Sequence, residues 1–444
     1  MSRWYYYLLC VTFLTLGLHS CTNDDDKPVY SVKYYSGKVA TDWFEMVRGL
    51  TKTTPGFSPP VASRAMGYCG VALYQSLVAG MPKNLSLEGQ LPDLSFLTTR
   101  PDESLNYHWD IVANAALANM CRLLYPTATD SMKNLINKLE SDNLASFGKD
   151  VPKADIDKAI AYGTNVSSEI FEWSKTDGGH EGYSKNFPAS YVVPQGPGLW
   201  IPTSAQKIPL QPYWGNNRTF ALGVADAVTP PLDLTYSEDR QSAFYKQALE
   251  VYNTAENLTS EQQIIAKYWS DDAGLPGTPP GHSMSVLNQI AKLENLNLAD
   301  CAETYAKLGM ALSDAFVCCW KTKYIHNLLR PVSYINALID PSWKTLLATP
   351  PFPEFTSGHS VQSGAFAAVM AARFGSNYSF TDHTHEARTD INGTARTFSS
   401  FKAMADEAAI SRLYGGIHYR EAIEDGVAQG GLVGNAILAL RWKK

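Results

Sequence analysis

The chain has 444 residues, of which 45% are hydrophobic and 18% are charged. This apolar fraction is ordinary for a globular protein and excludes global disorder, and the length allows one large domain or about two or three smaller ones. The formal net charge is −6, from 37 Lys and Arg against 43 Asp and Glu. Such a balance argues against nucleic acid as the main partner, because nucleic-acid binding needs a basic surface.

The first residues predict export. Arg3 supplies a positive charge, an apolar run follows, and Leu18-His19-Ser20-Cys21 resembles a bacterial lipobox. We therefore expect residues 1–21 to be a signal peptide, Cys21 to be lipidated and residues 22–36 to be a tether. The expected location is the outer membrane, on its periplasmic face or at the cell surface, with the lipid as the only membrane anchor. An ordinary cleaved signal peptide is the alternative.

Helical spacing of apolar side chains predicts an all-α protein of helical bundles with long Pro- and Gly-rich loops. We expect an N-terminal helical half over residues 37–175, a loop-rich connection over 176–236 and a C-terminal helical half over 237–444. The expected helices are 59–77, 107–124, 131–147, 155–173, one opening at a capping box of Thr259 and Gln262, one from residue 300, then 358–374, 399–414 and 419–440. Residues 376–396 are expected to form a polar loop.

Of the seven cysteines, five follow Cys21, and their irregular spacing indicates buried free thiols rather than a disulfide framework.

Three short segments carry the chemistry in combination. They are Lys323 with Arg330, then Thr356-Ser357-Gly358-His359, then Arg412 with His418. Lys323 and Arg330 are seven residues apart, a spacing that places both on one face of a helix, with Pro331 ending that helix. The Ser-Gly-His triplet precedes an apolar helical run, so it lies at a helix N-terminus with free backbone N–H groups. This set of cations, N–H groups and histidines is typical of a site for a tetrahedral oxyanion.

In this order the segments resemble the signature shared by vanadium-dependent haloperoxidases and the type 2 phosphatidic acid phosphatase superfamily, with the fungal chloroperoxidase type as the nearest match. The resemblance implies the helical-bundle fold of those proteins. It implies that the oxyanion, vanadate or phosphate, is held by Lys323, Arg330, Ser357, Gly358 and Arg412. It also implies that His418 is the apical vanadium ligand, or the phosphorylated nucleophile of a phosphatase, and that His359 is the general acid/base.

The resemblance extends to neighbouring positions. Trp320 and Phe352 fall where two aromatic residues line the halide pocket, and Asp272 falls on the carboxylate that pairs with the oxyanion-binding arginine and orients the acid/base histidine. Two positions depart from the pattern. Thr356 replaces the usual Pro before Ser-Gly-His, and Ala422 replaces the Asp that orients the last histidine in phosphatases, which leaves Glu421 or Glu424 as candidate substitutes.

We therefore expect a vanadate-dependent haloperoxidase-like enzyme that oxidises halide with hydrogen peroxide, in which Lys323 polarises the peroxide and an organic acceptor takes the halogen. One alternative is an acid phosphatase that hydrolyses phosphate monoesters through a phosphohistidine. A second is a non-catalytic surface-binding lipoprotein. The sequence leaves the halide, the organic substrate and the oligomeric state open.

Other polar groups have two interpretations each. His383-Thr384-His385, beside Asp382 and Glu386, is either a metal site or a solvated histidine pair on a polar loop. Asp271 is either an acid/base partner of Asp272 or a structural group at a helix end. His326 either lines the site or packs in the core, and His282 is expected in a Gly-rich loop.

Overall fold

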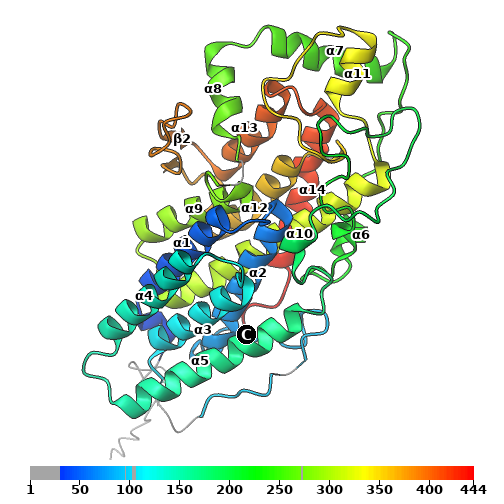
Figure 1. Ribbon diagram of the computed structural model, residues 1–444. Helices are drawn as coiled ribbons and strands as arrows, with labels where there is room; N and C mark the ends of the chain where they lie inside the picture. Colours follow the sequence, from blue (N-terminus) through cyan, green and yellow to red (C-terminus); the bar gives the residue numbers. More distant parts are fainter. Residues whose placement is uncertain (1–30, 96, 103–106, 272–273) are drawn as a thin grey trace, which may run out of the picture.

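The computed structural model describes residues 31–95, 97–102, 107–271 and 274–444 (Figure 1). The predicted signal peptide, Cys21, most of the predicted tether and Asp272 therefore lie outside the described residues. Within the described ranges, no helix combines the length and the apolar character that a membrane span requires.

The described chain is mostly helical, as predicted, and its regular structure is nearly all α-helix. The α-helices are α1 Lys38–Thr53, α2 Pro59–Leu77, α3 Trp109–Leu124, α4 Asp130–Phe147, α5 Lys153–Ser174, α6 Val224–Ala227, α7 Ala243–Glu256, α8 Ser260–Tyr268, α9 Thr278–Leu293, α10 Leu298–His326, α11 Pro331–Leu338, α12 Gly358–Phe374, α13 Phe401–Tyr414 and α14 Arg420–Leu438. Two short antiparallel strands, β1 Phe380–Asp382 and β2 Arg396–Phe398, pair with Phe380 opposite Phe398.

α10 is central to the arrangement and packs against α2, α12 and α14 (Figure 1). Its contact with α2 is close because small residues face each other there. A Cβ on Gly70 would lie 2.7 Å from the Tyr305 carbonyl oxygen, and one on Gly309 would lie 2.7 Å from the Met66 carbonyl oxygen. Any larger side chain would force the helices apart, so these glycines set the position of α10, which carries Trp320 and Lys323.

α12 and α14 meet in the same way. A Cβ on Gly430 would lie 1.9 Å from the Val361 carbonyl oxygen, and one on Gly364 would lie 2.3 Å from that of Val427. This close packing fixes the N-terminus of α12 beside the loop that leads into α14, and both ends contribute to the site described below.

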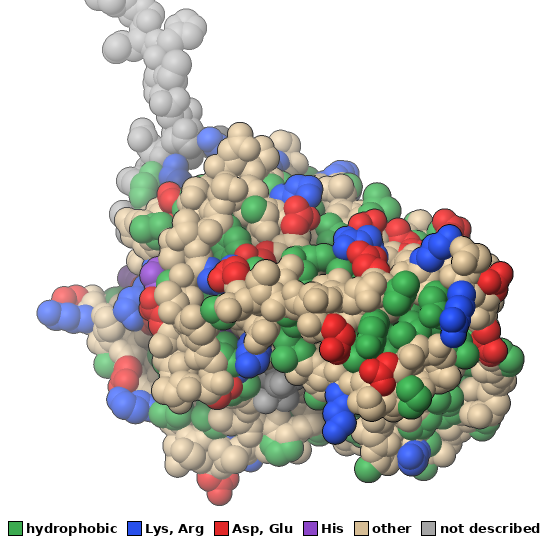
Figure 2. Space-filling model, turned by 90° about the horizontal axis from the view of Figure 1, so that it is seen from above, with side chains coloured by type: hydrophobic (Ala, Val, Ile, Leu, Met, Phe, Trp, Pro, Cys, Tyr) green, Lys and Arg blue, Asp and Glu red, His purple; other side chains and the backbone are tan. Residues whose placement is uncertain are grey.

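The larger cluster of buried apolar side chains runs through α1–α5, α9, α10 and α12, and so joins residues before and after the 176–236 segment. A smaller cluster lies under α7, α11, α13 and the start of α14. On the face shown in Figure 2, acidic and basic side chains are interspersed rather than gathered by sign.

Several predicted elements are confirmed. α2 and α12 have the expected bounds, α8 opens with the capping box of Thr259 and Gln262, and the five described cysteines are free and buried. The polar loop predicted over 376–396 is wrong in part, because β1 lies within it. His282 was expected in a loop but lies in α9, which starts with Thr278-Pro279-Pro280. Proline fits a first helical turn, where its missing N–H is not needed.

Candidate active site

Two of the three motif segments line one cavity of about 410 Å³, and Arg330 of the remaining segment contacts His418 in its wall. Its wall includes Gly358 and His359 at the start of α12, Arg412 near the end of α13, and His418 just before α14. Trp320 of α10 and Phe352 of the loop between α11 and α12 also line it, with their ring centroids 5.0 Å apart. The remaining wall is mainly apolar, formed by Phe316, Ile417 and the 346–351 segment.

His418 is held in one tautomer by two partners. Its Nδ1 lies 2.7 Å from Glu354 Oε1, and its Nε2 lies 3.1 Å from Arg330 Nη1. A carboxylate accepts and a guanidinium donates, so we assign the proton to Nδ1 and the lone pair to Nε2. Burial, reinforced by the positive charge of Arg330, holds the pKa of His418 well below its usual range. A neutral imidazole with its lone pair on Nε2 is the form that binds a metal, in place of the Arg330 hydrogen bond that Nε2 accepts here.

Glu354 is the carboxylate that orients His418, and the sequence analysis did not identify it. The same Oε1 also accepts the backbone N–H of Tyr419 at 2.9 Å, and burial raises the pKa of Glu354 to about 7. The predicted substitutes for the missing Asp are therefore wrong. Glu421 accepts the backbone N–H groups of 233 and 234, and Glu424 pairs with Arg420.

Arg330 is fully buried and only partly satisfied. Its Nε donates to the Phe352 carbonyl at 2.9 Å and its Nη1 donates to the Ile417 carbonyl at 2.8 Å. Its Nη2 is also buried, and it has no hydrogen-bond partner among the described residues. Burial lowers the pKa of Arg330 only to about 10, so the guanidinium stays charged at neutral pH. A buried N–H group of a cation without an acceptor indicates a place for an anion.

Lys323 is also fully buried, and its Nζ donates to the backbone carbonyls of Pro353, Glu354 and Thr356. Burial lowers its pKa to about 8. The ring of Phe352 lies 5.1 Å from Lys323 Nζ and 5.0 Å from Arg330 Cζ, within cation–π range of both. The two cations thus fix the loop that carries Phe352 and Glu354.

The prediction that Lys323 and Arg330 share one helix face is wrong. α10 ends at His326, where Asn327 takes a left-handed conformation with φ of 47°. Arg330 is instead the residue that caps α11, and Pro331 begins that helix rather than ending the previous one. The two side chains converge because the chain turns between them.

The Ser-Gly-His turn opens α12 as predicted. Ser357 is the N-cap, its Oγ accepts the Ser360 N–H at 3.4 Å, and its own N–H donates to the Ala422 carbonyl at 2.9 Å. The N–H groups of the first turn lie beside the cavity through Gly358 and His359. This end of α12 is electropositive and suited to an anion.

His359 and Asp271 both line the cavity and lie close to each other. Its Nε2 lies 3.7 Å from Asp271 Oδ2 and, among the described residues, has no hydrogen-bond partner. Burial, and then the charge of Arg412, lower the pKa of His359 to about 3, so its ring is neutral. Asp272, the carboxylate predicted to orient this histidine, lies outside the described residues. Arg412 donates to the Trp269 carbonyl at 2.7 Å and so ties α13 to the end of α8.

The indole N–H of Trp320 binds a residue that is not part of the cavity wall. Its Nε1 donates to the Leu210 carbonyl at 3.1 Å, which attaches the loop-rich 176–236 segment to α10. His326 lies outside the cavity wall, with its Nε2 3.3 Å from the Pro230 carbonyl and its ring against Phe355. The packing interpretation of His326 therefore fits the structure better.

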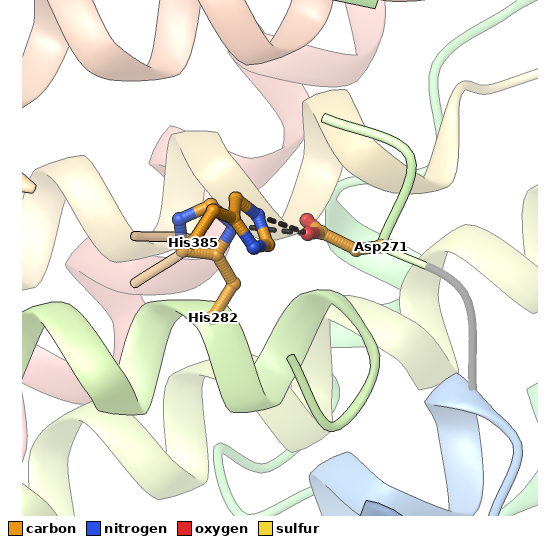
Figure 3. Close-up of side chains that lie close together, drawn as sticks. All are labelled: Asp271, His282 and His385. Carbon is orange, nitrogen blue, oxygen red and sulfur yellow. Dashed lines mark hydrogen bonds and ion pairs between the residues drawn. The ribbon is translucent and has the colours of Figure 1, made fainter. Parts of the chain in front are cut away.

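A second polar cluster of Asp271, His282 and His385 (Figure 3) adjoins His359 through Asp271. Asp271 Oδ1 is 2.9 Å from His282 Nδ1 and 3.4 Å from His385 Nε2, and His282 Nε2 is 2.7 Å from Asp382 Oδ2. Burial opposes a charge on His282, but the two carboxylates raise its pKa to about 10. The predicted solvated pair of His383 and His385 is wrong, because His385 is 1% exposed while His383 is on the surface and bonds Glu386.

Known proteins share both the sequence and the fold. The family described as VCPO second helical-bundle domain matches residues 336–442. Vanadium chloroperoxidase from Curvularia inaequalis is 26% identical over 370 residues, which are 70% of this chain and 60% of that protein. The matched region thus spans less than two thirds of that relative's length.

Among solved structures, the first bacterial vanadium-dependent iodoperoxidase matches with a TM-score of 0.83 and 35% identity, over 92% of this chain and 98% of that one. Holo and apo structures of a bacterial vanadium-dependent chloroperoxidase have TM-scores of 0.68 and 0.66 at 14% identity, over 87% of this chain and 92% and 95% of theirs, which shows a shared fold alone. The expected closeness to the fungal type needs correction, since identity to the bacterial iodoperoxidase is higher than to the Curvularia protein. The likeness to the iodoperoxidase spans nearly the whole of both chains, and on that ground this chain belongs to the vanadium-dependent haloperoxidase family of oxidoreductases.

Proposed function

We propose that this protein is a vanadate-dependent haloperoxidase that oxidises iodide with hydrogen peroxide, as its likeness to an iodoperoxidase suggests. The observation that carries the proposal is the state of His418. Glu354 fixes its Nδ1 proton, so that the Nε2 lone pair lies next to a buried cation, Arg330. That arrangement suits a ligand of a metal oxyanion better than it suits a proton donor.

The residues present fit vanadate. Arg330 Nη2 is buried and has no acceptor among the described residues, and the N-terminus of α12 brings backbone N–H groups to the cavity that His418 lines. We propose that His418 ligates the metal and that Arg330, Arg412, Ser357 and Gly358 hold the oxygens. Lys323 completes the set only if its Nζ exchanges one of its three carbonyl partners for an oxyanion oxygen.

When bound, vanadate supplies a Lewis acid that activates peroxide toward halide. The protein's own part is proton handling and exclusion of water. His359 is neutral, and its Nε2 has no hydrogen-bond partner among the described residues, so this nitrogen can accept a proton from peroxide and return it to a leaving oxygen. A nearby negative oxyanion would raise the basicity of His359, and Asp271 Oδ2 would stabilise its charged form.

The halide is proposed to approach along Trp320 and Phe352, which form the apolar side of the cavity next to the proposed oxyanion site. Apolar walls remove water from an incoming anion, and the ring edges and nearby cations attract it. The organic acceptor would then meet the oxidised halogen in the 410 Å³ cavity or in solution.

An acid phosphatase is the second candidate, and one observation favours it. The missing Asp at Ala422 weakened the phosphatase interpretation, but Glu354 supplies a carboxylate to the Nδ1 of His418. His418 Nε2 could therefore attack phosphorus, with His359 protonating the leaving oxygen. A non-catalytic binding protein would not need this set of buried, mutually oriented groups.

The test is halide oxidation by the purified protein, with iodide or bromide and peroxide, with and without orthovanadate. We expect vanadate-dependent formation of triiodide that disappears in His418→Ala and persists in His326→Ala, a matched change at a histidine outside the cavity. Absence of vanadate-dependent oxidation of either halide would overturn the proposal. Hydrolysis of p-nitrophenyl phosphate, blocked by vanadate, would then support the phosphatase.

We further propose that the protein is exported and held at the outer membrane through lipid on Cys21, with no other membrane anchor. The lipobox-like Leu18-His19-Ser20-Cys21 supports this. Cys21→Ser should move the protein from the membrane fraction to the soluble fraction, and unchanged membrane association would contradict the proposal.

A further inference from the structure

Three polar side chains lie together beside the cavity, and only one of them, Asp271, has a part in the proposed halide chemistry. Asp271 follows α8, His282 is in α9 and His385 follows β1, so three separate segments deliver them (Figure 3). One carboxylate oxygen and one nitrogen from each ring lie within 4.8 Å of one another, and all three residues are buried. Two imidazoles and a carboxylate are a ligand set that zinc uses in proteins.

Asp382, which contacts the second ring nitrogen of His282, supports this ligand set. The Nε2 of His282 is 2.7 Å from Asp382 Oδ2, and that carboxylate is itself fixed by the Tyr268 hydroxyl at 2.7 Å and the Thr384 N–H at 2.9 Å. Ligating histidines commonly donate their second ring N–H to such an outer carboxylate, which fixes the tautomer and leaves the other nitrogen facing the metal. Here that other nitrogen is Nδ1, which faces Asp271.

His385 supplies an independent observation. It is 1% exposed, and neither of its ring nitrogens makes a hydrogen bond within the described part of the chain. Its ring is held edge-on against those of Tyr268 and His282, each at 4.7 Å between centroids, which aims Nε2 at Asp271 Oδ1 3.4 Å away. A buried imidazole with two unsatisfied nitrogens is unfavourable unless something binds one of them.

The charge of the buried carboxylates also favours a bound cation. Asp271 and Asp382 are both buried, and every ion-pair contact found for them in the described ranges is with a histidine. One imidazolium offsets one of the two negative charges. A divalent cation bound by neutral His282 and His385 would offset both, and its binding would release the proton that His282 Nδ1 otherwise donates to Asp271.

We propose that Asp271, His282 and His385 bind a divalent transition-metal ion, zinc by ligand chemistry, with water completing the coordination. This site is separate from the oxyanion site and shares with it only Asp271, whose Oδ1 faces the metal ligands and whose Oδ2 faces His359. The ion would fasten α8, α9 and the loop after β1 together behind the acid/base histidine. The proposal holds whether the oxyanion site serves a haloperoxidase or a phosphatase.

Metal content tests the proposal without any assay of activity. The purified full protein is dialysed against a weak chelator, and its zinc is measured by mass spectrometry, with vanadate absent. We expect about one zinc ion per chain, and Co²⁺ taken up by the stripped protein should show the intense visible bands of four-coordinate cobalt. His418→Ala should keep this zinc while it loses halide oxidation, so a failure of the proposed function is distinguishable from a failure of the metal site.

Variants locate the ion. His385→Ala and His282→Ala should lose the zinc and the cobalt bands. His383→Ala should keep both, since His383 is an exposed histidine two residues away in the same loop. Should the alanine variants fail to fold, the cobalt spectrum of the wild-type protein decides alone. A wild-type protein without zinc and without cobalt bands, or His385→Ala with full zinc, would overturn the proposal.

Discussion

Glu354 Oε1 lies 2.7 Å from His418 Nδ1 and binds the next backbone N–H, that of Tyr419, with the same oxygen. A carboxylate three residues before the Ser-Gly-His turn thus orients the histidine that we propose as the vanadium ligand. Because Lys323 also binds the Glu354 carbonyl, the position of the carboxylate is fixed from both the side chain and the backbone.

Glu354→Gln should weaken vanadate binding. The amide oxygen can still accept the Nδ1 proton, but the negative charge that raises the basicity of His418 is lost. Removing such an outer partner of a metal ligand typically weakens binding about 10- to 100-fold. Titration of the apoprotein with orthovanadate, followed by recovered halide oxidation, gives the dissociation constant, and Glu354→Ala should be weaker still.

Glu421→Gln is the matched control for this change, since Glu421 was a candidate for the same role but binds the 233–234 backbone instead. Its vanadate affinity should equal that of the wild-type protein. Equal affinity in Glu354→Gln and wild type would show that the carboxylate has no part in holding the oxyanion.

The sequence could not have revealed this partner by spacing alone. Because Ala422 stands where the usual Asp would be, the sequence indicated only carboxylates close to it. Residues close in sequence lie close together on a helix. Glu354 instead reaches His418 from a loop 64 residues earlier in the chain. Two carboxylates at 421 and 424 were nearer in sequence but point to the 233–234 backbone and to Arg420.

Arg330→Lys should also reduce vanadate affinity, by about 100-fold, because hydrogen bonds to charged groups contribute roughly 1.5–3 kcal/mol each. Lysine cannot reproduce the fork that binds the carbonyls of Phe352 and Ile417 and leaves Nη2 for an anion. The measurement is again the vanadate dissociation constant. Arg420→Lys, at a partly exposed arginine paired with Glu250, is the control and should leave it unchanged. A fall of less than about threefold in Arg330→Lys would contradict the assigned role.

Trp320→Phe tests whether the indole N–H binds halide or only stabilises the fold. Its N–H is already bound to the Leu210 carbonyl, so it is not available as a donor to halide. We expect the iodide KM to change by less than about threefold, while the free energy of unfolding falls by about 0.5–1.5 kcal/mol through the lost hydrogen bond. Chemical denaturation and steady-state kinetics on the same preparation give both values. A large rise in KM with unchanged stability would place the N–H at the halide instead.

Local periodicity and capping predicted α2, α8 and α12 well, since these depend on residues close in sequence. The features that were not predicted depend on residues that are far apart in the sequence and meet only in the folded protein. His282 was expected in a Gly-rich loop but lies in α9, and His385, for which a solvated pair was one of two interpretations, is buried against Tyr268. Asp271 had no local signal for its place between His282 and His359, because those partners come from α9 and α12.

Asp314 of α10 should make stability depend on pH in a defined direction. Its two carboxylate oxygens accept the backbone N–H groups of Phe220 and Ala221, each at 2.8 Å, and burial raises its pKa from 3.8 to about 7. Between these values the folded protein holds a proton that the unfolded chain releases. This group therefore lowers the free energy of unfolding as pH rises from about 4 to about 7, by at most about 1.4 kcal/mol per pH unit, with no further change above that window.

Asp314→Asn removes the titrating group while keeping its shape, and its stability should not show this loss. The quantity to measure is the difference in free energy of unfolding between wild type and variant, from urea denaturation at several pH values from 5 to 8, because the other titrating groups cancel in it. We expect the free energy of unfolding of the wild type to fall relative to that of Asp314→Asn as pH rises to about 7. Above that pH the difference should stay level. A difference that stays level from pH 5 to pH 8 would contradict this, and would mean that the two N–H donors outweigh burial and keep the folded pKa of Asp314 from rising above 3.8.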